Sequence, residues 1–319
     1  MKPLTFKPKS RWREFIGEKA ISMSAYAALV AIFLIFIFIF KESLPIFTDP
    51  KVRQEASLDR LFLKQPFYED SERLWVWQPT SDEPKYSLMP LFIGTFKAAL
   101  IAMLFATPLA VLAAIYTSEF ASKRMREIIK PTIELLAGLP SVVLGFFALI
   151  VLASILQDTF GLVFRLNALN AGLALGITVI PVIFTIAEDA MSAVPHSLRD
   201  AATALGATPW QVSLTMVLPA ALPGIAAGVV LGFGRAIGET MIVLMASGNA
   251  AIVSGSLTDS IRTLSATIAA ELAEVVFGSG HYSVLFFIGT LLFLFTFLIN
   301  LGGDLVLHRL KERLQGRSS

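Results

Sequence analysis

Five long apolar runs without a charged side chain constrain this chain more than any other feature. Each is close to the roughly 20 residues that an α-helix needs to cross a bilayer. The overall composition agrees, with 55% hydrophobic residues, 16% charged residues and a mean hydropathy of +0.71. A water-facing surface does not tolerate that composition, so the sequence predicts an all-α integral membrane protein. The runs cover residues 20–40, 98–116, 135–157, 166–187 and 282–303.

A sixth crossing is expected inside the uncharged stretch 201–234. This stretch is too long for one crossing, and it changes character at Pro219. We place a helix at 219–246, the fifth crossing in chain order. It differs from the other five because it carries Arg235 and Glu239 near its middle.

Lysine and arginine in the flanking segments predict the orientation. Six lie in the first 20 residues, four lie in 118–131, and four follow Asp304. Because such residues accumulate on the cytoplasmic side, both termini are expected in the cytoplasm of a bacterial inner membrane. The expected organisation is a basic N-terminal segment (1–20), a first transmembrane helix (21–40), a periplasmic insertion (41–88), a permease core with five transmembrane helices (89–310) and a cytoplasmic tail (311–319).

The first apolar run is expected to remain as a helix, because 21 residues is long for the apolar region of a signal peptide and no small-residue cleavage site follows. The insertion after it carries Trp75 and Trp77. These indoles are typical of an aromatic anchor at the membrane interface, and the alternative is a docking surface for an outer partner.

The residue inventory excludes several classes of protein. The chain has no cysteine, and His196, His281 and His308 are too scattered in sequence to suggest a metal site. It has no phosphate-binding Gly-x-x-x-x-Gly-Lys-Ser/Thr loop and no nucleophile with its base, so it is not expected to be an enzyme. The net charge of +2 gives no reason to expect nucleic acid as a partner.

Between the fourth and fifth crossings, residues 197–218 read as two short helices. Ser197 and Asp200 have the spacing of a capping box, Gly206 predicts a helix stop, and Thr208 with Gln211 predicts a second helix start. On these local signals alone, the segment is a helical hairpin.

The spacing within this hairpin resembles the cytoplasmic motif of ABC importer permeases. That motif is Glu-Ala-Ala, three residues, Gly, nine residues, then Ile-x-Leu-Pro; here Asp replaces Glu and Met216 replaces Ile. The resemblance implies a six-span, MetI-like type I permease fold, and a loop that fits a groove of the ATPase subunit and transmits its movement. The residues that match the coupling motif are Asp200, Ala201, Ala202, Gly206, Leu218 and Pro219.

Arg235 and Glu239 are expected near the middle of the bilayer, where an arginine costs at least roughly 2.5 to 3.5 kcal/mol. Four residues apart on one helix, they would lie within reach of each other. Either they only neutralise each other or they line a path for a charged solute. An anion is favoured, because a guanidinium donates forked hydrogen bonds to phosphate-like oxygens.

Small residues follow the same helix at four-residue spacing and predict close packing against another helix. The sequence leaves open whether that neighbour belongs to this chain or to a second permease. The strip consists of Ala220, Gly224, Gly228 and Gly232.

The segment 234–241, Gly-Arg-Ala-Ile-Gly-Glu-Thr-Met, is similar to that of PstC permeases of bacterial phosphate ABC importers. Tyr86 with Pro90, Gly94-Thr95 and the segment 133–141 add to the resemblance, which spans about 86–310. The related PstA permeases usually lack the Met.

The PstC resemblance implies import of inorganic phosphate by alternating access. Arg235, Glu239 and Thr240 would lie on the solute path, as binding group, gate or structural pair. The implied partners are a PstA-like permease, a PstB-like ATPase dimer that binds ATP and Mg, and a PstS-like periplasmic phosphate-binding protein; this chain itself would bind no cofactor.

Two other readings remain open at this point. A permease for another oxyanion, such as sulfate or molybdate, would share the coupling motif. An ATP-independent anion transporter or channel would explain Arg235 and Glu239, but would leave the pattern from Asp200 to Pro219 as coincidence.

Overall fold

The structure, a computed structural model, describes residues 11–66 and 73–315. Within them, six helical segments are long and apolar enough to cross a membrane, as the sequence predicts. These segments are Glu14–Thr48, Met89–Phe120, Ser141–Phe160, Ala168–Ser192, Pro209–Gly238 and Gly280–Leu305. Parts of the expected N-terminal segment (1–10), insertion (67–72) and tail (316–319) lie outside the described residues.

Helices make up most of the described chain, and three π-helical turns (η1–η3) continue or interrupt them. The elements before the second crossing are α1 (Arg11–Ser43), α2 (Pro45–Thr48), α3 (Pro50–Glu55) and α4 (Leu58–Phe62). From there to the hairpin they are α5 (Met89–Ile115), η1 (Tyr116–Phe120), α6 (Lys123–Ala137), α7 (Ser141–Phe147), η2 (Ala148–Leu152), α8 (Ala153–Phe160) and α9 (Ala168–Ser192). The rest are α10 (His196–Ala204), α11 (Pro209–Val212), η3 (Ser213–Val217), α12 (Leu218–Gly238), α13 (Met241–Ala246), α14 (Leu264–Glu271) and α15 (Gly280–Gln315).

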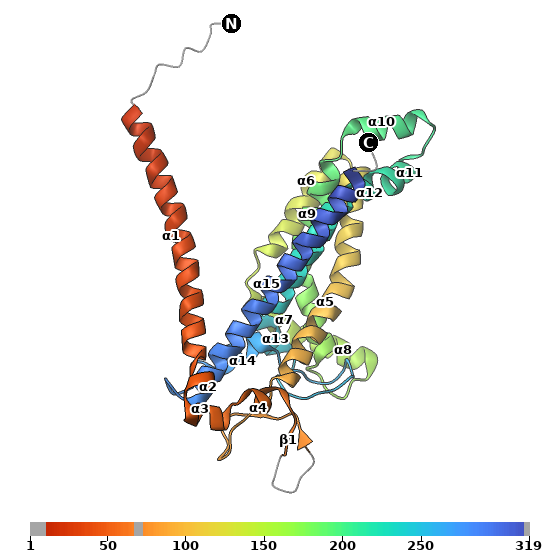
Figure 1. Ribbon diagram of the computed structural model, residues 1–319. Coiled ribbons are helices and arrows are strands. Elements are labelled where there is room, and N and C mark those ends of the chain that lie inside the picture. The colour runs from red at the N-terminus through yellow and green to blue at the C-terminus, as the bar shows by residue number, and fades with distance from the viewer. Residues whose placement is uncertain (1–10, 67–72, 316–319) are drawn as a thin grey trace.

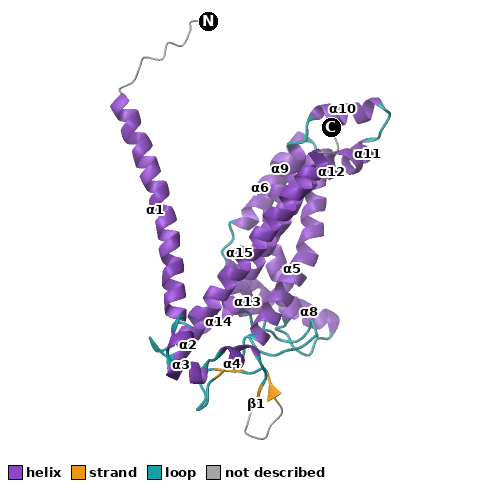
Figure 2. Ribbon diagram, in the orientation of Figure 1, coloured by secondary structure: helices purple, strands orange, loops and turns teal. Residues whose placement is uncertain are grey.

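The two ends of the bundle differ in what they carry (Figure 1). The helical hairpin of α10 and α11 lies at one end, which we call the hairpin end, together with the start of α1 and the end of α15. Short strands and loops cover the opposite end, the strand end (Figure 2). Two antiparallel pairs form there, β1 (Gln65–Pro66) with β2 (Arg73–Leu74), and β3 (Trp77–Gln78) with β4 (Lys85–Tyr86).

The bundle core is built around α5, α9 and α12. Small residues let these helices approach closely. Within a bilayer the hydrophobic effect does not drive helices together, so they associate through close packing of this kind. Gly172 and Gly176 of α9 face Ile101 and Phe105 of α5, where any added Cβ would collide or nearly collide with the facing side chain. Ala102 of α5 is fully buried in the same contact. The core therefore depends on the absence of side-chain bulk.

Helix α1 stands away from the bundle along most of its length (Figure 1). It joins α15 only near the strand end, where the rings of Phe36 and Phe293 lie 3.8 Å apart and those of Phe38 and Phe286 lie 5.7 Å apart. The most apolar window of α1 buries none of its residues inside the chain. Its apolar surface is thus available to lipid or to another subunit.

The insertion folds as a small module with its own apolar core, which we call the insertion module (45–88). Its buried side chains pack onto the strand-end parts of α14 and α15. Trp77 is 8% exposed and donates from Nε1 to Oε1 of Glu271 at 3.0 Å. A buried indole cannot anchor in headgroups, so that expectation is wrong for Trp77, and the docking surface for an outer partner stays a prediction. Trp75 is half-buried and donates to the carbonyl oxygen of Phe62 at 3.4 Å.

Most helices extend beyond the apolar runs that predicted them. Helix α5 begins at Met89, where the permease core was expected to begin, and helix α1 spans Arg11–Ser43 rather than 21–40. The run 135–157 is divided, because α6 ends at Ala137 and α7 begins only after Pro140, which lacks the backbone N–H that a continuous helix needs. Charged and polar residues extend a helix as readily as apolar ones once they reach beyond the lipid.

Candidate solute path and helical hairpin

Arg235 lies in the last turn of α12, inside a segment long enough to cross the membrane. Its side chain is exposed, and it makes no hydrogen bond or ion pair with any residue of the described ranges 11–66 and 73–315. A guanidinium within a bilayer requires water, an anion or another protein surface beside it. We take Arg235 as the first residue of a candidate solute path, because the described residues leave its charge without a partner.

Glu239 does not continue the helix that carries Arg235. Helix α12 ends at Gly238, Glu239 is extended (φ −68°, ψ 134°), and α13 begins at Met241. The expectation of one helix over 219–246 is wrong. So is the expectation that Arg235 and Glu239 share a helix face, and no ion pair joins them among the described residues.

Side-chain hydroxyls stabilise the break between α12 and α13. Ser265 Oγ donates to the carbonyl oxygen of Glu239 at 2.7 Å, and Thr240 Oγ1 donates to that of Gly238 at 3.3 Å. A helix can break at membrane depth only where its freed backbone groups find such partners. Broken helices are a recurring feature of solute sites in transporters, because they expose backbone groups and helix ends to the solute.

Two polar side chains in the membrane-crossing helices were missed by the sequence analysis, and Asn300 is the one beside Arg235's neighbour Gly234. Asn300 of α15 lies next to Gly234, since a Cβ built at Gly234 would stand 3.3 Å from its Oδ1. Lys97 lies in α5 and donates from Nζ to the carbonyl oxygens of Ser254 and Ser256, the latter at 2.8 Å. Lys97 directly precedes the apolar run 98–116, and Asn300 is an uncharged residue within another run, so neither interrupts the apolar pattern.

The small-residue strip of α12 packs on α9 of this same chain. A Cβ at Gly224 would collide with Ala190, one at Gly228 would stand 3.2 Å from the Cβ of Ile186, and one at Gly232 would stand 2.9 Å from side-chain atoms of Ile183. The three glycines thus pack on a helix of this chain, which identifies the neighbour that the sequence left open, whereas Ala220 at the start of the strip is exposed.

The helical hairpin turns at Gly206, which has a φ of +86°. The Gly206 N–H donates to the carbonyl oxygen of Thr203 at 2.9 Å, and the Ala207 N–H donates to that of Ala202 at 3.1 Å. This pair of bonds is the Schellman arrangement that ends helices at a left-handed residue, a conformation that costs glycine little. A Cβ at Gly206 would have no atom within 4 Å, so the backbone conformation alone explains the glycine here.

The starts of the two hairpin helices differ from each other. Thr208 and Gln211 form the expected capping box, with bonds of 2.9 and 3.3 Å. The capping box expected from Ser197 and Asp200 is wrong, because α10 begins at His196, its cap position is Pro195, two residues before Ser197, and it has no side-chain cap. Proline fixes the backbone angle φ just ahead of the helix. We take this to be why α10 starts there without a side-chain oxygen as its cap.

The motif residues divide between an exposed face and a buried one. Asp200, Ala201 and Gly206 are exposed, whereas Ala202 is buried against the bundle. Leu205 is 90% exposed at the tip of the hairpin. The other two members, Leu218 and Pro219, open α12. The hairpin therefore presents small, acidic and apolar side chains away from the bundle.

A cluster of polar side chains closes the strand end. Glu271 accepts hydrogen bonds from Trp77 and from His281 Nε2 at 2.8 Å, and its Oε1 forms an ion pair with Arg262 Nη2 at 2.8 Å. Burial raises the pKa of Glu271, but the bonds from His281 and Trp77 and the charge of Arg262 outweigh it and hold the pKa below its usual value. A pocket of about 470 Å³ borders the cluster, with Glu274 on its rim. Glu271 thus fastens the insertion module to α14 and α15.

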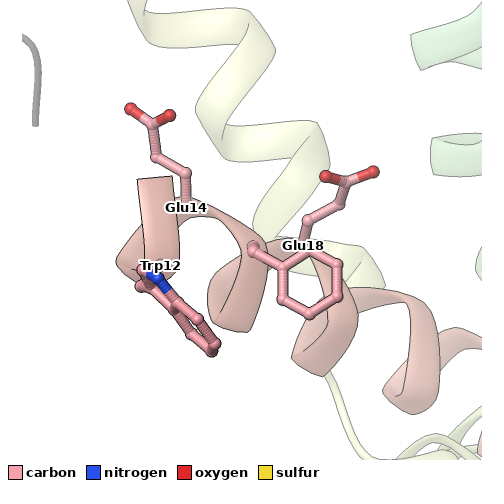
Figure 3. A pocket seen from close by; sticks show the side chains of 4 residues that line it. Trp12, Glu14 and Glu18 are labelled. Carbon is pink, nitrogen blue, oxygen red and sulfur yellow. The ribbon is translucent and has the colours of Figure 1, made fainter. Parts of the chain in front are cut away.

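A hollow of about 510 Å³ near the start of α1 is not a candidate site (Figure 3). Its lining residues are Trp12, Glu14, Phe15 and Glu18, all on one helix. A single helix cannot surround a ligand. Within the described ranges, no group of three or more histidine, aspartate or glutamate side chains is placed to hold a metal ion.

Six membrane-crossing segments, an unpartnered arginine beside a helix break and a helical hairpin at one end define the chain as a transport permease. Residues 106–315 match the family described as binding-protein-dependent transport system inner membrane component. The chain belongs to this family. It is therefore a multi-pass protein of the inner membrane.

Relatives in two bacteria are similar over most of the chain. The chain is 36% identical to a probable ABC transporter permease protein, YqgH, of Bacillus subtilis, over 70% of this chain and 72% of the relative. It is 38% identical to the phosphate transport system permease protein PstC of Mesorhizobium japonicum, over 70% of this chain and 73% of the relative.

Solved structures of ABC transporters share the fold. A bacterial ABC transporter involved in the import of the acidic polysaccharide alginate matches with a TM-score of 0.60 and 15% identity, over 94% of this chain and 99% of that chain. The methionine transporter MetNI in an inward-facing conformation matches with a TM-score of 0.52 and 18% identity, over 70% of this chain and 94% of that chain. The expected MetI-like permease fold is confirmed.

Proposed function

We propose that this chain is the PstC-type permease subunit of an ATP-driven importer that moves inorganic phosphate across the inner membrane. The observation that carries the proposal is Arg235, an unpartnered cation at a helix break, within a segment that resembles the phosphate permeases. The similarity to curated PstC permeases supports the same solute. Alternating access would expose this arginine to one side of the membrane and then to the other.

The chemistry of Arg235 suits an oxyanion. Its planar guanidinium donates parallel hydrogen bonds to two oxygens of a phosphate. Glu239 and Thr240 would act at the same break, where the Thr240 hydroxyl would turn from the Gly238 carbonyl to the anion and Glu239 would repel or redirect the anion. A phosphate would thus be held by few groups, which permits release.

ATP hydrolysis would be carried out by partner subunits, a PstB-like dimer that binds ATP and Mg. The absence of a phosphate-binding loop anywhere in this sequence supports that division of labour. The exposed face of the helical hairpin, with Asp200, Ala201 and Gly206, is the surface on which such a partner would bind. Small side chains there allow two backbones to approach closely.

A PstA-like second permease would complete the path, and a PstS-like periplasmic protein would deliver phosphate at the strand end. Two features support a second permease. The side chain of Arg235 is exposed, and the apolar surface of the membrane-crossing helix α1 is not buried by the described residues of this chain. The basic flanks support a cytoplasmic hairpin end with both termini. The insertion module would then face the periplasm.

Competition between oxyanions tests this function. The assembly of this chain with its second permease, ATPase and binding protein would be reconstituted in proteoliposomes, and uptake of labelled phosphate measured with excess sulfate or molybdate. We expect saturable phosphate uptake that neither competitor reduces. Uptake of sulfate in place of phosphate would contradict the solute and retain the permease.

A further inference from the structure

The guanidinium of Arg199, on α10 of the hairpin, forms a two-pronged contact with Glu119. Nη2 donates to Oε1 of Glu119 at 2.8 Å, and Nε donates to Oε2 at 3.2 Å. Paired bonds of this kind fix orientation as well as distance. The hairpin is therefore attached to the end of α5 by a contact that fixes both the distance and the orientation between the two segments.

The same guanidinium also binds the end of α9. It donates from Nη2 to the carbonyl oxygen of Met191 at 2.9 Å, and from Nη1 to that of Val194. The Arg199 and Glu119 side chains are only 17% and 9% exposed. Loss of one partner would leave a largely buried charge without compensation, so the contact resists separation.

A second contact lies directly beside the first. The ring of Trp210, on α11, lies 5.9 Å from that of Phe120. The two helices of the hairpin therefore contact successive residues, Glu119 and Phe120, one through a salt bridge and one through aromatic rings.

Glu119 and Phe120 belong to η1, the π-helical turn that ends α5. Arg126 of α6 donates to the carbonyl oxygens of Thr117 and Ser118 in this turn, the former at 3.0 Å. Single π-turns within helices are rare and occur often at functional sites. Because η1 continues α5, and α5 packs along α9 and α12, a displacement of η1 would also displace the core helices.

We propose that the Arg199–Glu119 pair is the contact through which movement of the hairpin is passed to α5 and so to the solute path. The inference rests on the proposed function and adds a positioning residue pair to it. Neither residue belongs to the coupling motif that the sequence analysis identified. If the pair only stabilises the fold, its loss would reduce assembly and leave transport per ATP unchanged.

The test compares two glutamates close together in sequence. Glu119→Gln keeps the shape of the side chain and removes its charge. Glu127→Gln is the matched control, because Glu127 is exposed and makes no hydrogen bond or ion pair with the described residues. In the reconstituted assembly, we expect Glu119→Gln to retain the ATPase partner and its basal ATP hydrolysis, while phosphate uptake per ATP falls about tenfold. Glu127→Gln should keep the wild-type ratio.

A cross-link separates transmission from folding. Because the chain has no cysteine, the double variant Glu119→Cys with Arg199→Cys can be joined by a short bifunctional thiol reagent. We expect a low ratio of uptake to ATP before cross-linking and recovery of most of it afterwards. A wild-type ratio in Glu119→Gln, or a ratio that stays low after efficient cross-linking, would overturn the proposal.

Failure of the proposed solute would be recognised separately. If the wild-type assembly takes up no phosphate, the solute is wrong. The pair is then judged by whether binding protein still stimulates ATP hydrolysis, a signal that must cross the membrane. We expect Glu119→Gln to lose this stimulation and Glu127→Gln to keep it, and equal stimulation in both would contradict the pair's role.

Discussion

The backbone of Arg262 lies directly against Gly94 of α5, so that a Cβ at Gly94 would collide with the Arg262 carbonyl oxygen and stand 3.0 Å from its carbonyl carbon. The next residue strengthens the contact, because Thr95 Oγ1 accepts a hydrogen bond from the Leu264 N–H at 3.0 Å. Gly94 and Thr95 thus hold the strand-end loop and α14 to the start of α5. This gives a structural reason for the Gly-Thr pair noted in the sequence.

We expect Gly94→Ala to destabilise the chain by about 1 to 3 kcal/mol, since the backbone of Arg262 must move to admit a methyl group. Thermal unfolding of the purified protein in detergent measures this. Gly255→Ala is the control, because a Cβ there has no atom within 4 Å. Equal melting temperatures for the two variants would contradict the close contact.

The strip of α12 yields a second prediction. Gly232→Leu should destabilise the bundle by about 1 to 3 kcal/mol, because its side chain would overlap Ile183 and Val179 of α9. Gly302→Leu, on α15, is the control, because a Cβ there has no atom within 4 Å. Unfolding followed by loss of helical circular dichroism distinguishes them, and a strip that tolerates leucine would show that α9 and α12 are not closely packed.

The Glu271 cluster predicts a pH dependence. Because folding lowers the pKa of Glu271, its ionised form stabilises the folded chain above the ordinary carboxyl pKa of about 4.3, and this contribution is lost as the pH falls through the lowered pKa. At neutral pH, Glu271→Gln should cost about 1 to 3 kcal/mol.

The difference between wild type and Glu271→Gln should shrink as the pH falls below about 4. Melting temperatures measured across that range check the sign. Glu274→Gln, at an exposed residue of the same pocket, should melt as the wild type does at every pH. A difference that grows on acidification would contradict the assignment of Glu271 as an ionised acceptor.

Arg235 provides the prediction for transport. Arg235→Gln should fold normally, since the side chain is exposed and has no partner in the described chain. Phosphate uptake should fall by about tenfold or more, because a hydrogen bond from a charged donor is worth about 1.5 to 3 kcal/mol. Arg124→Gln, at an exposed arginine on α6, should transport normally. Normal uptake by Arg235→Gln would remove Arg235 from the path.

The sequence predicted the parts of the fold that depend on local pattern. The membrane-crossing segments follow from apolar runs, and the hairpin turn follows from Gly206 and the Thr208 cap, because each signal lies within a few residues. The cap of the first hairpin helix was placed two residues late, since Pro195 stands where a side-chain cap was expected at Ser197.

The tertiary partners could not be predicted in the same way. The end of α12 at Gly238 depends on Ser265, which lies in a distant part of the chain and donates to the freed carbonyl of Glu239. Likewise Arg199 donates a hydrogen bond to Glu119, eighty positions away in the sequence, and Trp77 donates one to the distant Glu271. Such pairs follow from packing, which one sequence does not reveal.

The most direct measurement of the central claim is the initial rate of labelled phosphate uptake into proteoliposomes that hold the whole assembly, with ATP or a non-hydrolysable analogue at the hairpin side. The account predicts uptake against a gradient with ATP and none with the analogue, and no uptake by this chain alone. Uptake that proceeds equally with the analogue, or with this chain alone, would contradict the assignment as an ATP-driven permease subunit.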